Sequence, residues 1–223
     1  MTTRFDPLAI GEYYHVYNRG ADKRVLFKDN ADYKRFIELL FLSNTHERIN
    51  IRNIRRTYES VFDFDRGEPL VYIGAYCLMP NHFHILLTPA VDNGIQTFML
   101  KLSTGYSMYF NKRYERTGIL YQGHFKSSHA FTDEYLKYLF SYIHLNPVKL
   151  IQSDWKEVGI RDIDKTRAYL NEYLYSSLPD YMGSRTESAI LERHKFPAYF
   201  ASKQKIDAEL LGWLNYGELL PNS

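Results

Sequence analysis

The sequence predicts a compact α+β domain of the ferredoxin-like (split βαβ) kind, in which an antiparallel sheet carries helices on one face and is followed by a C-terminal helical extension. Three observations lead to this expectation. Strand and helix patterns follow in the order βαββαβα, two strand patterns are joined by a short turn, and the composition is globular, with 45% hydrophobic and 24% charged residues. We place the domain at residues 1–150 and the extension, packed on this core, at residues 151–223.

A strand and a helix open the predicted domain. Residues 13–20 have the β-branched and aromatic content of a strand and end at a glycine. Asn30 is expected to cap a helix, because apolar residues recur behind it at helical spacing. These are Phe36, Ile37, Leu40 and Phe41. Residues 44–68 lack clear periodicity, so we expect a long insertion there.

The next two strands form a predicted hairpin. Residues 70–79 and 82–88 are strand-like runs separated only by Pro80 and Asn81. A turn this short makes the two strands antiparallel neighbours in the sheet.

The last three elements are a helix, a strand and a helix. Residues 95–115 carry an apolar helical stripe, and residues 122–131 can form a strand. The final helix begins near Thr132, a residue suited to the N-cap, and Pro147 ends it. Its expected core stripe is Leu136, Leu139, Phe140 and Ile143.

Composition excludes several classes of protein. The single cysteine, Cys77, cannot form a disulfide within the chain, and residues 1–6 lack the apolar run of a secretory signal. We therefore expect a cytoplasmic protein. No stretch approaches the roughly 18 apolar residues of a membrane helix, so no membrane partner is expected.

The charges suit a nucleic acid. The net charge is only +2, but cations concentrate between residues 101 and 130, and aromatic residues lie among them. Basic groups attract phosphates and aromatic faces stack on unpaired bases, so this stretch would suit single-stranded nucleic acid. A solvated helix face with core tyrosines would give the same counts.

Two histidines in the second arm of the hairpin are candidate metal ligands. His82 and His84 are two apart on a strand, so both side chains project from one face while Phe83 enters the other. Two neutral imidazoles placed in this way can share a metal ion. They are also compatible with an ordinary solvated strand face.

A tyrosine and an asparagine at the end of the last helix form a second candidate group. Tyr142 and Asn146 are four residues apart, so they share a helix face. A phenolic oxygen can act as a covalent nucleophile, and an amide oxygen is a hard neutral metal ligand. With 20 tyrosines in the chain, packing roles for Tyr142 and a helix-ending role for Asn146 stay open.

Three ordered sequence blocks resemble those of the REP-associated tyrosine transposases, a branch of the single-tyrosine HUH transposases. They are Met79-Pro-Asn-His-Phe-His-Ile-Leu-Leu87, Thr117-Gly-Ile-Leu-Tyr-Gln-Gly-His-Phe-Lys-Ser127 and Tyr142-Ile-His-Leu-Asn-Pro-Val148. The resemblance covers roughly residues 10–180. It departs from the family at His124, where an arginine is common.

The resemblance implies a site and a reaction. His82, His84 and Asn146 would bind a divalent metal, Mg²⁺ or Mn²⁺, and Tyr142 would be the nucleophile. Residues 1–150 would then be the catalytic domain of a transposase that nicks, transfers and rejoins single-stranded DNA at hairpin (REP-like) sequences through a 5′-phosphotyrosine. Such an enzyme would work in the cytoplasm at the nucleoid, as a monomer or homodimer.

The sequence contains further candidate site residues and is compatible with other functions. Lys112, Arg113 and Lys126 are candidate contacts to the DNA backbone, and Tyr138, one turn before Tyr142, is the rival nucleophile. A hairpin-binding protein of the same descent that does not cleave DNA is the alternative function. A zinc hydrolase would need a carboxylate base near the histidine pair, and Asn81 and the other sequence neighbours supply none.

Overall fold

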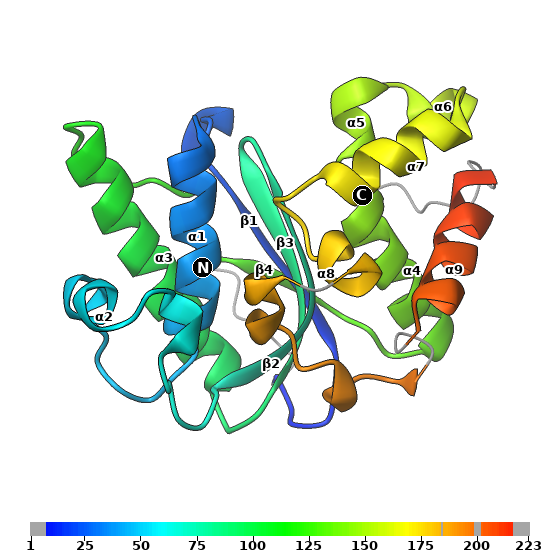
Figure 1. Cartoon of the computed structure of the whole chain (residues 1–223). Helices are drawn as coiled ribbons and strands as arrows, with labels where there is room; N and C mark the ends of the chain where they lie inside the picture. Colours follow the sequence, from blue (N-terminus) through cyan, green and yellow to red (C-terminus); the bar gives the residue numbers. More distant parts are fainter. Residues whose placement is uncertain (1–7, 184, 199–201, 216–223) are drawn as a thin grey trace.

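An antiparallel sheet forms the centre of the molecule. A computed structural model of the chain describes residues 8–183, 185–198 and 202–215 (Figure 1). The four strands are β1 (Tyr14–Arg19), β2 (Val71–Met79), β3 (His82–Pro89) and β4 (Lys126–His129). Their order is β2-β3-β1-β4, and every neighbouring pair is antiparallel. Because β3 lies between β1 and β2, this is the split βαβ arrangement, and the predicted α+β fold is confirmed.

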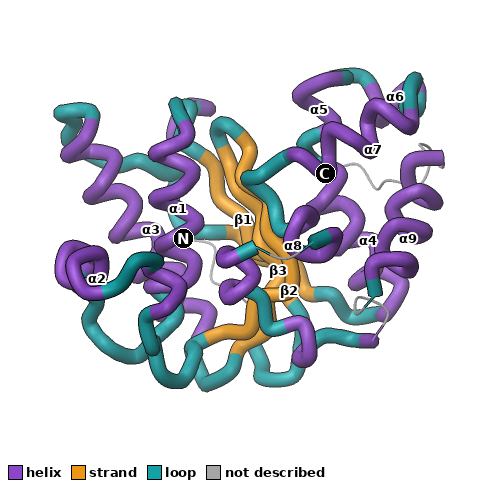
Figure 2. Tube along the Cα trace, viewed as in Figure 1, coloured by secondary structure: helices purple, strands orange, loops and turns teal. Residues whose placement is uncertain are grey.

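Helices lie on both sides of the sheet, and not on one face alone as expected (Figures 1 and 2). On one side lie α1 (Asn30–Leu42) and α3 (Gly94–Arg113), the two helices that connect strands of the split βαβ units. On the other side lies α4 (Asp133–Leu145). The later helices α5 (Val148–Ile151), α6 (Trp155–Val158), α7 (Ile163–Glu172), α8 (Leu178–Met182) and α9 (Lys203–Asn215) are on this side as well. Within the described residues, no helix has the length and apolar character needed to cross a membrane.

Local capping fixes where the helices begin. Asp29, and not Asn30 as expected, caps α1, because its extended backbone lets the side chain accept hydrogen bonds from the amides of Ala31 and Asp32 at 3.0 and 3.2 Å. The prediction for α4 is confirmed. The hydroxyl of Thr132 accepts a hydrogen bond from the Tyr135 amide at 3.1 Å.

Two predicted segments differ in the structure. The insertion at 44–68 contains a short helix, α2 (Ile51–Thr57), and the 3₁₀ helix η2 (Val61–Asp63). Asn50 caps α2. Both helices are too short to show a helical periodicity in the sequence. The strand expected at 122–131 is reduced to β4, because the chain turns at Gly123, whose φ of 73° is in the left-handed region.

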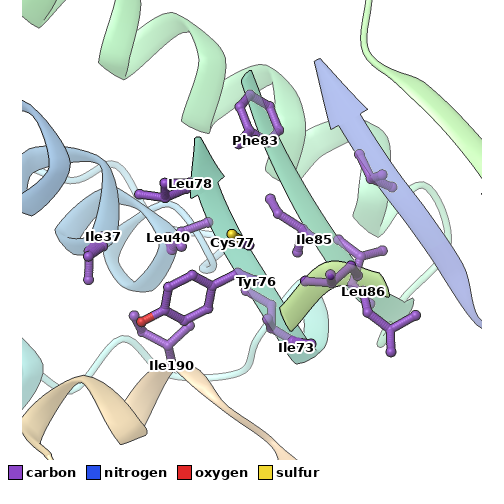
Figure 3. Packing of buried hydrophobic residues seen from close by; sticks show 14 of the residues in the cluster. Ile37, Leu40, Ile73, Tyr76, Cys77, Leu78, Phe83, Ile85, Leu86 and Ile190 are labelled. Carbon is purple, nitrogen blue, oxygen red and sulfur yellow. The ribbon is translucent and has the colours of Figure 1, made fainter. Parts of the chain in front are cut away.

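The hydrophobic core lies on both faces of the sheet. On the face toward α1, Leu78 lies beside Leu40 of the helix (Figure 3). Phe83, its partner across the hairpin, packs against Phe36 of α1, with the two rings 5.0 Å apart. Leu136, Leu139, Phe140 and Ile143 of α4 are buried on the other side, as their spacing predicts. Both faces of the sheet are therefore covered, which explains why β2 and β3 read as nearly continuous apolar runs.

The chain after residue 150 packs on the edge of β2. The Ser177 amide donates to the Tyr76 carbonyl and the Leu78 amide donates to the Tyr175 carbonyl, both at 2.9 Å. These bonds satisfy an edge that would otherwise present unpaired backbone groups. Residues 1–7 of the predicted domain lie outside the described part of the chain. So do residues 184, 199–201 and 216–223 of the predicted extension.

Candidate active site

His82 and His84 lie side by side on β3, on the face that α4 covers. Their ring centroids are 5.0 Å apart, with the planes at 87°. Phe83, between them, points to the opposite face and into the core. The strand alternation therefore places the two imidazoles as the sequence predicts.

A third histidine, His15 on β1, joins this pair. Its Nε2 lies 2.8 Å from Nδ1 of His84, a hydrogen bond between two buried rings. The register explains the contact, because β1 and β3 pair Tyr17 with His84 and His15 with Leu86, which puts His15 diagonally opposite His84. Sequence reasoning missed His15. The available signal was the alternation of His15, Tyr17 and Arg19 along one face of the first strand.

Tyr142 reaches the histidines from α4. Its ring lies 5.5 Å from that of His84 and 6.0 Å from that of His15, in both cases edge to face. The side chain is half-buried, whereas the rival nucleophile Tyr138 is buried, and desolvation raises its pKa. Of the two tyrosines, Tyr142 thus has the better access to a substrate at the histidines.

Asn146 lies one turn beyond Tyr142, at the end of α4. Its side-chain amide donates a hydrogen bond to the Tyr142 carbonyl at 2.9 Å and so closes the helix, as one of the sequence interpretations expected. This bond uses the Nδ2 group and leaves Oδ1 as the acceptor. Asn146 is half-buried. Along the chain it lies between Tyr142, whose ring contacts His84, and Lys149, whose charge lowers the pKa of His82.

Burial, assisted by nearby cations, keeps the two histidines neutral. Burial, together with the charges of Arg19 and Lys149, lowers the pKa of His82 to about 4. Burial also lowers the pKa of His84, together with His15, His82 and Lys156. Neutral imidazoles are the form that binds a metal.

Lys156 of α6 extends over the nucleophile candidate. Its Nζ lies 4.8 Å from the centre of the Tyr142 ring, a cation–π contact. Burial lowers the pKa of this half-buried lysine, as does the nearby charge of Lys149, while Glu157 opposes the shift. The chain that follows α4 therefore contributes a cation to the site.

The histidine pair could supply nitrogen ligands to a divalent cation. Nε2 of His84 is buried and has no hydrogen-bond partner among the described residues, so it can bind a metal in the tautomer that leaves a lone pair on it. Among the described residues, no group of three or more His, Cys, Asp or Glu side chains is arranged to hold one. A third protein ligand would therefore have to be of another type, and the amide oxygen of Asn146 is the candidate.

The three cations predicted to contact DNA occupy different settings. Lys112 is exposed on α3, on the side of the sheet away from the histidines. Arg113, beside it, forms ion pairs with Asp29 at 2.6 Å and with Asp32 at 2.7 Å. Lys126 is exposed on β4 and pairs with Tyr17, which puts it on the face of the histidines. The structure does not bring these three side chains together.

Two other histidines have structural partners. Nε2 of the buried His144 lies 2.8 Å from the hydroxyl of Ser177, and Nε2 of His129 lies 2.6 Å from a carboxylate oxygen of Glu12.

Comparisons with solved structures agree with the fold. A structure of a REP-associated tyrosine transposase bound to a REP hairpin has 12% sequence identity and a TM-score of 0.52, over 88% of this chain and 89% of that one. The tRNA(His) guanylyltransferase of Saccharomyces cerevisiae has 11% identity over 89% and 86% of the two chains, with a TM-score of 0.35, too low to indicate a shared fold. None of the curated proteins matches the sequence.

A family model supplies the sequence relationship. The model described as "Transposase IS200 like" matches residues 33–146, just over half of the 223 residues. This range includes His82, His84, Tyr142 and Asn146. The chain belongs to the IS200-like transposase family.

Proposed function

We propose that this protein is a metal-dependent transposase that cleaves and rejoins single-stranded DNA at hairpins, with Tyr142 as its nucleophile. The observation that carries the proposal is the edge-to-face packing of Tyr142 on His84, 5.5 Å between ring centroids, at a buried histidine pair. The transposase family supports the class of reaction. The REP hairpin bound to the structure of similar fold supports hairpin DNA as the substrate.

The proposed step exchanges one ester for another. The phenolic oxygen of Tyr142 attacks the phosphorus of a phosphodiester, and the bond from phosphorus to the 3′-oxygen breaks. The phenolic proton passes to water, and the leaving 3′-oxygen takes up a proton from water. The products are a 5′-phosphotyrosine and a free 3′-hydroxyl, which can attack the phosphotyrosine in reverse and rejoin the strand.

The residues around Tyr142 would prepare this step. His82, His84 and Asn146 would hold Mg²⁺ or Mn²⁺, and the amide oxygen favours these hard ions. When bound, such an ion neutralises charge on the scissile phosphate and on the leaving oxygen. Arg19, Lys149 and Lys156 add positive charge that attracts the DNA backbone. Fixing Tyr142 beside the bound phosphate makes the attack effectively unimolecular.

A covalent-adduct assay tests the proposal. Incubating the protein with a hairpin oligonucleotide labelled at its 3′ end and Mn²⁺ should give a labelled protein–DNA adduct that survives denaturant. Tyr142→Phe should abolish the adduct, because phenylalanine has no oxygen to form the ester, and removing the metal with EDTA should also abolish it. Tyr138→Phe is the matched control and should retain it.

The same assay distinguishes DNA cleavage from the alternative function, hairpin binding without cleavage. An undiminished adduct in Tyr142→Phe would overturn the assignment of the nucleophile. Tight binding without any adduct, across a panel of hairpins with metal present, would instead establish a hairpin-binding protein that does not cleave DNA.

A further inference from the structure

We propose that His15 is a positioning residue of the metal site, a role that rests on the proposed function: it accepts a hydrogen bond from His84 and thereby frees the other ring nitrogen of His84 for the cation. The two rings meet at 2.8 Å between Nε2 of His15 and Nδ1 of His84. Their planes are within 21° of parallel, and both side chains are buried, so water does not compete for the bond.

The proton on this hydrogen bond decides what His84 can do. A neutral imidazole has one N–H donor and one acceptor nitrogen. If His84 donates through Nδ1, its Nε2 carries a lone pair. If His15 donates instead, Nε2 of His84 carries the hydrogen, and this buried donor meets no acceptor in the described part of the chain. The first arrangement leaves a nitrogen able to bind a cation, and the second does not.

His82 shows the same arrangement with a different partner. Its Nδ1 lies 2.7 Å from Oδ1 of Asn81, and Nδ2 of Asn81 donates to the Lys23 carbonyl at 3.2 Å. This second bond sets the orientation of the amide, so Oδ1 faces His82 and accepts its Nδ1 hydrogen. Nε2 of His82 is then the lone-pair nitrogen as well. Metal-binding histidines typically donate their other ring N–H in this way.

Packing holds the His15 ring in place. It lies 5.0 Å from the Tyr17 ring on its own strand and 6.0 Å from the ring of Tyr142. The strand register fixes its distance from His84. A side chain held on several sides can direct a partner ring with little loss of its own freedom.

Ring-nitrogen NMR tests the role directly. In ¹⁵N-labelled full-length protein at neutral pH, two-bond couplings to the ring protons show which nitrogen of each histidine carries hydrogen. We expect the hydrogen of His84 on Nδ1. A hydrogen on Nε2 of His84 would overturn the proposal, whatever the protein does to DNA.

Substitutions separate the hydrogen bond from packing. His15→Phe keeps a ring and loses the acceptor, while His15→Gln restores a polar group. With hairpin DNA present and Tyr142→Phe in the background to prevent cleavage, His15→Phe should weaken Mn²⁺ binding about 10- to 100-fold by electron paramagnetic resonance, and His15→Gln should recover part of the loss. His129→Phe, on the opposite face of the sheet, is the control. It should change neither the Mn²⁺ affinity nor the ring-nitrogen signals of His84.

The failures are distinguishable. An unchanged Mn²⁺ affinity in a folded His15→Phe protein would contradict the role of His15 and leave the nucleophile assignment intact. If His15→Phe does not fold, the NMR result on the unmodified histidines still decides. A missing adduct in the Tyr142-containing protein would contradict the proposed function instead.

Discussion

The cations predicted to contact DNA differ in whether an acidic side chain already pairs with them. The guanidinium of Arg113 binds Asp29 and the fully buried Asp32, whose carboxylate also accepts hydrogen bonds from Tyr109 and Tyr114. Removing Arg113 would leave a buried carboxylate short of its counter-charge. Lys126 is exposed on the face of the histidines, so its removal is not expected to destabilise a buried charge.

Two matched substitutions test this difference. Arg113→Gln should lower the urea concentration at which the protein unfolds, because Asp32 loses its ion pair. Lys126→Gln should leave that midpoint unchanged and weaken DNA binding, reducing the slope of log K against log salt by about 0.7 if it contacts one phosphate of a single strand. Denaturation curves and binding titrations at several salt concentrations measure both. A stable Arg113→Gln protein with weakened DNA binding would instead make Arg113 a DNA contact.

The candidate site was only partly predictable from single residues. His82 and His84 share a strand, and Tyr142 shares a helix face with Asn146, so the spacing along one element was enough to group each pair. The hydrogen bond between His15 and His84 joins residues 69 apart and depends on which strand lies beside β3 and in which register. Sequence periodicity contains neither piece of information.

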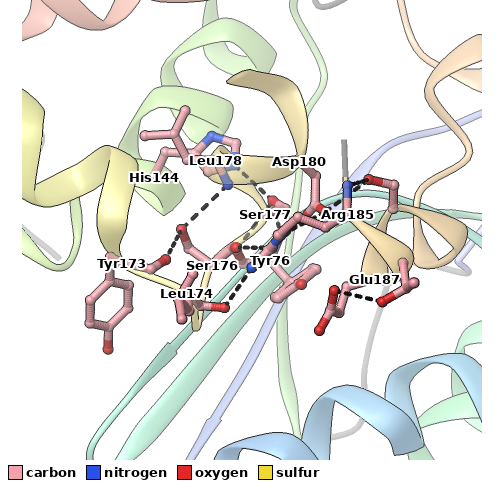
Figure 4. A network of polar contacts seen from close by, with 12 residues as sticks. Tyr76, His144, Tyr173, Leu174, Ser176, Ser177, Leu178, Asp180, Arg185 and Glu187 are labelled. Atoms are coloured by element: carbon pink, nitrogen blue, oxygen red, sulfur yellow. Dashed lines mark hydrogen bonds and ion pairs between the residues drawn. The ribbon is translucent and has the colours of Figure 1, made fainter. Parts of the chain in front are cut away.

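At the scale of elements, a buried polar network fixes the rotation of α4 (Figure 4). His144, two residues after Tyr142, bonds to the Ser177 hydroxyl, which also accepts from the Tyr76 amide of β2 at 2.9 Å. Nearby, Arg185 pairs with the fully buried Asp180 at 2.5 Å and donates to two backbone carbonyls. The chain after residue 150 thereby links α4 to the sheet and helps direct Tyr142 toward the histidines.

Breaking this network should be costly. Arg185→Met leaves the Asp180 carboxylate buried without its ion pair, so we expect the free energy of unfolding to fall by about 3–5 kcal/mol. Arg161→Gln removes the exposed pair with Asp154 and should change it by less than about 1 kcal/mol. Urea unfolding monitored by circular dichroism gives both values. Equal, small effects would show that the network does not hold the element in place.

Element types were predicted better than their limits. The hairpin and α4 follow from strong local signals, a two-residue turn and an N-cap before an apolar stripe. β4 is shorter than expected because Gly123 turns the chain, and α2 was hidden because seven residues give too few helical repeats to recognise. The coverage of the second sheet face by α4 depends on packing between distant segments.

At the scale of the whole molecule, two helical layers bury both faces of the sheet and several neutral histidines with them. Burial lowers the pKa of His15 to about 4 and that of His144 to about 3, from an ordinary value of 6.5. In the unfolded chain these rings take up protons as the pH falls below 6.5, while in the folded protein they stay neutral. Acid therefore favours the unfolded state.

The stability of the protein should accordingly fall with pH. Between about pH 6.5 and pH 4, each such histidine should lower the free energy of unfolding by up to about 1.4 kcal/mol per pH unit. His144→Gln removes one titrating group and should make the decline shallower by that amount. Urea unfolding at a series of pH values measures the slope. A free energy of unfolding that is constant over this window would contradict the neutral burial of these rings.

The most direct measurement is the site of attachment of cleaved DNA. After reaction with a hairpin oligonucleotide and Mn²⁺, the adduct is digested with protease and nuclease, and the modified peptide is sequenced by tandem mass spectrometry. The account predicts a nucleotide joined through phosphate to the side chain of Tyr142. A phosphodiester bond to Tyr138, or to any other residue, would contradict it.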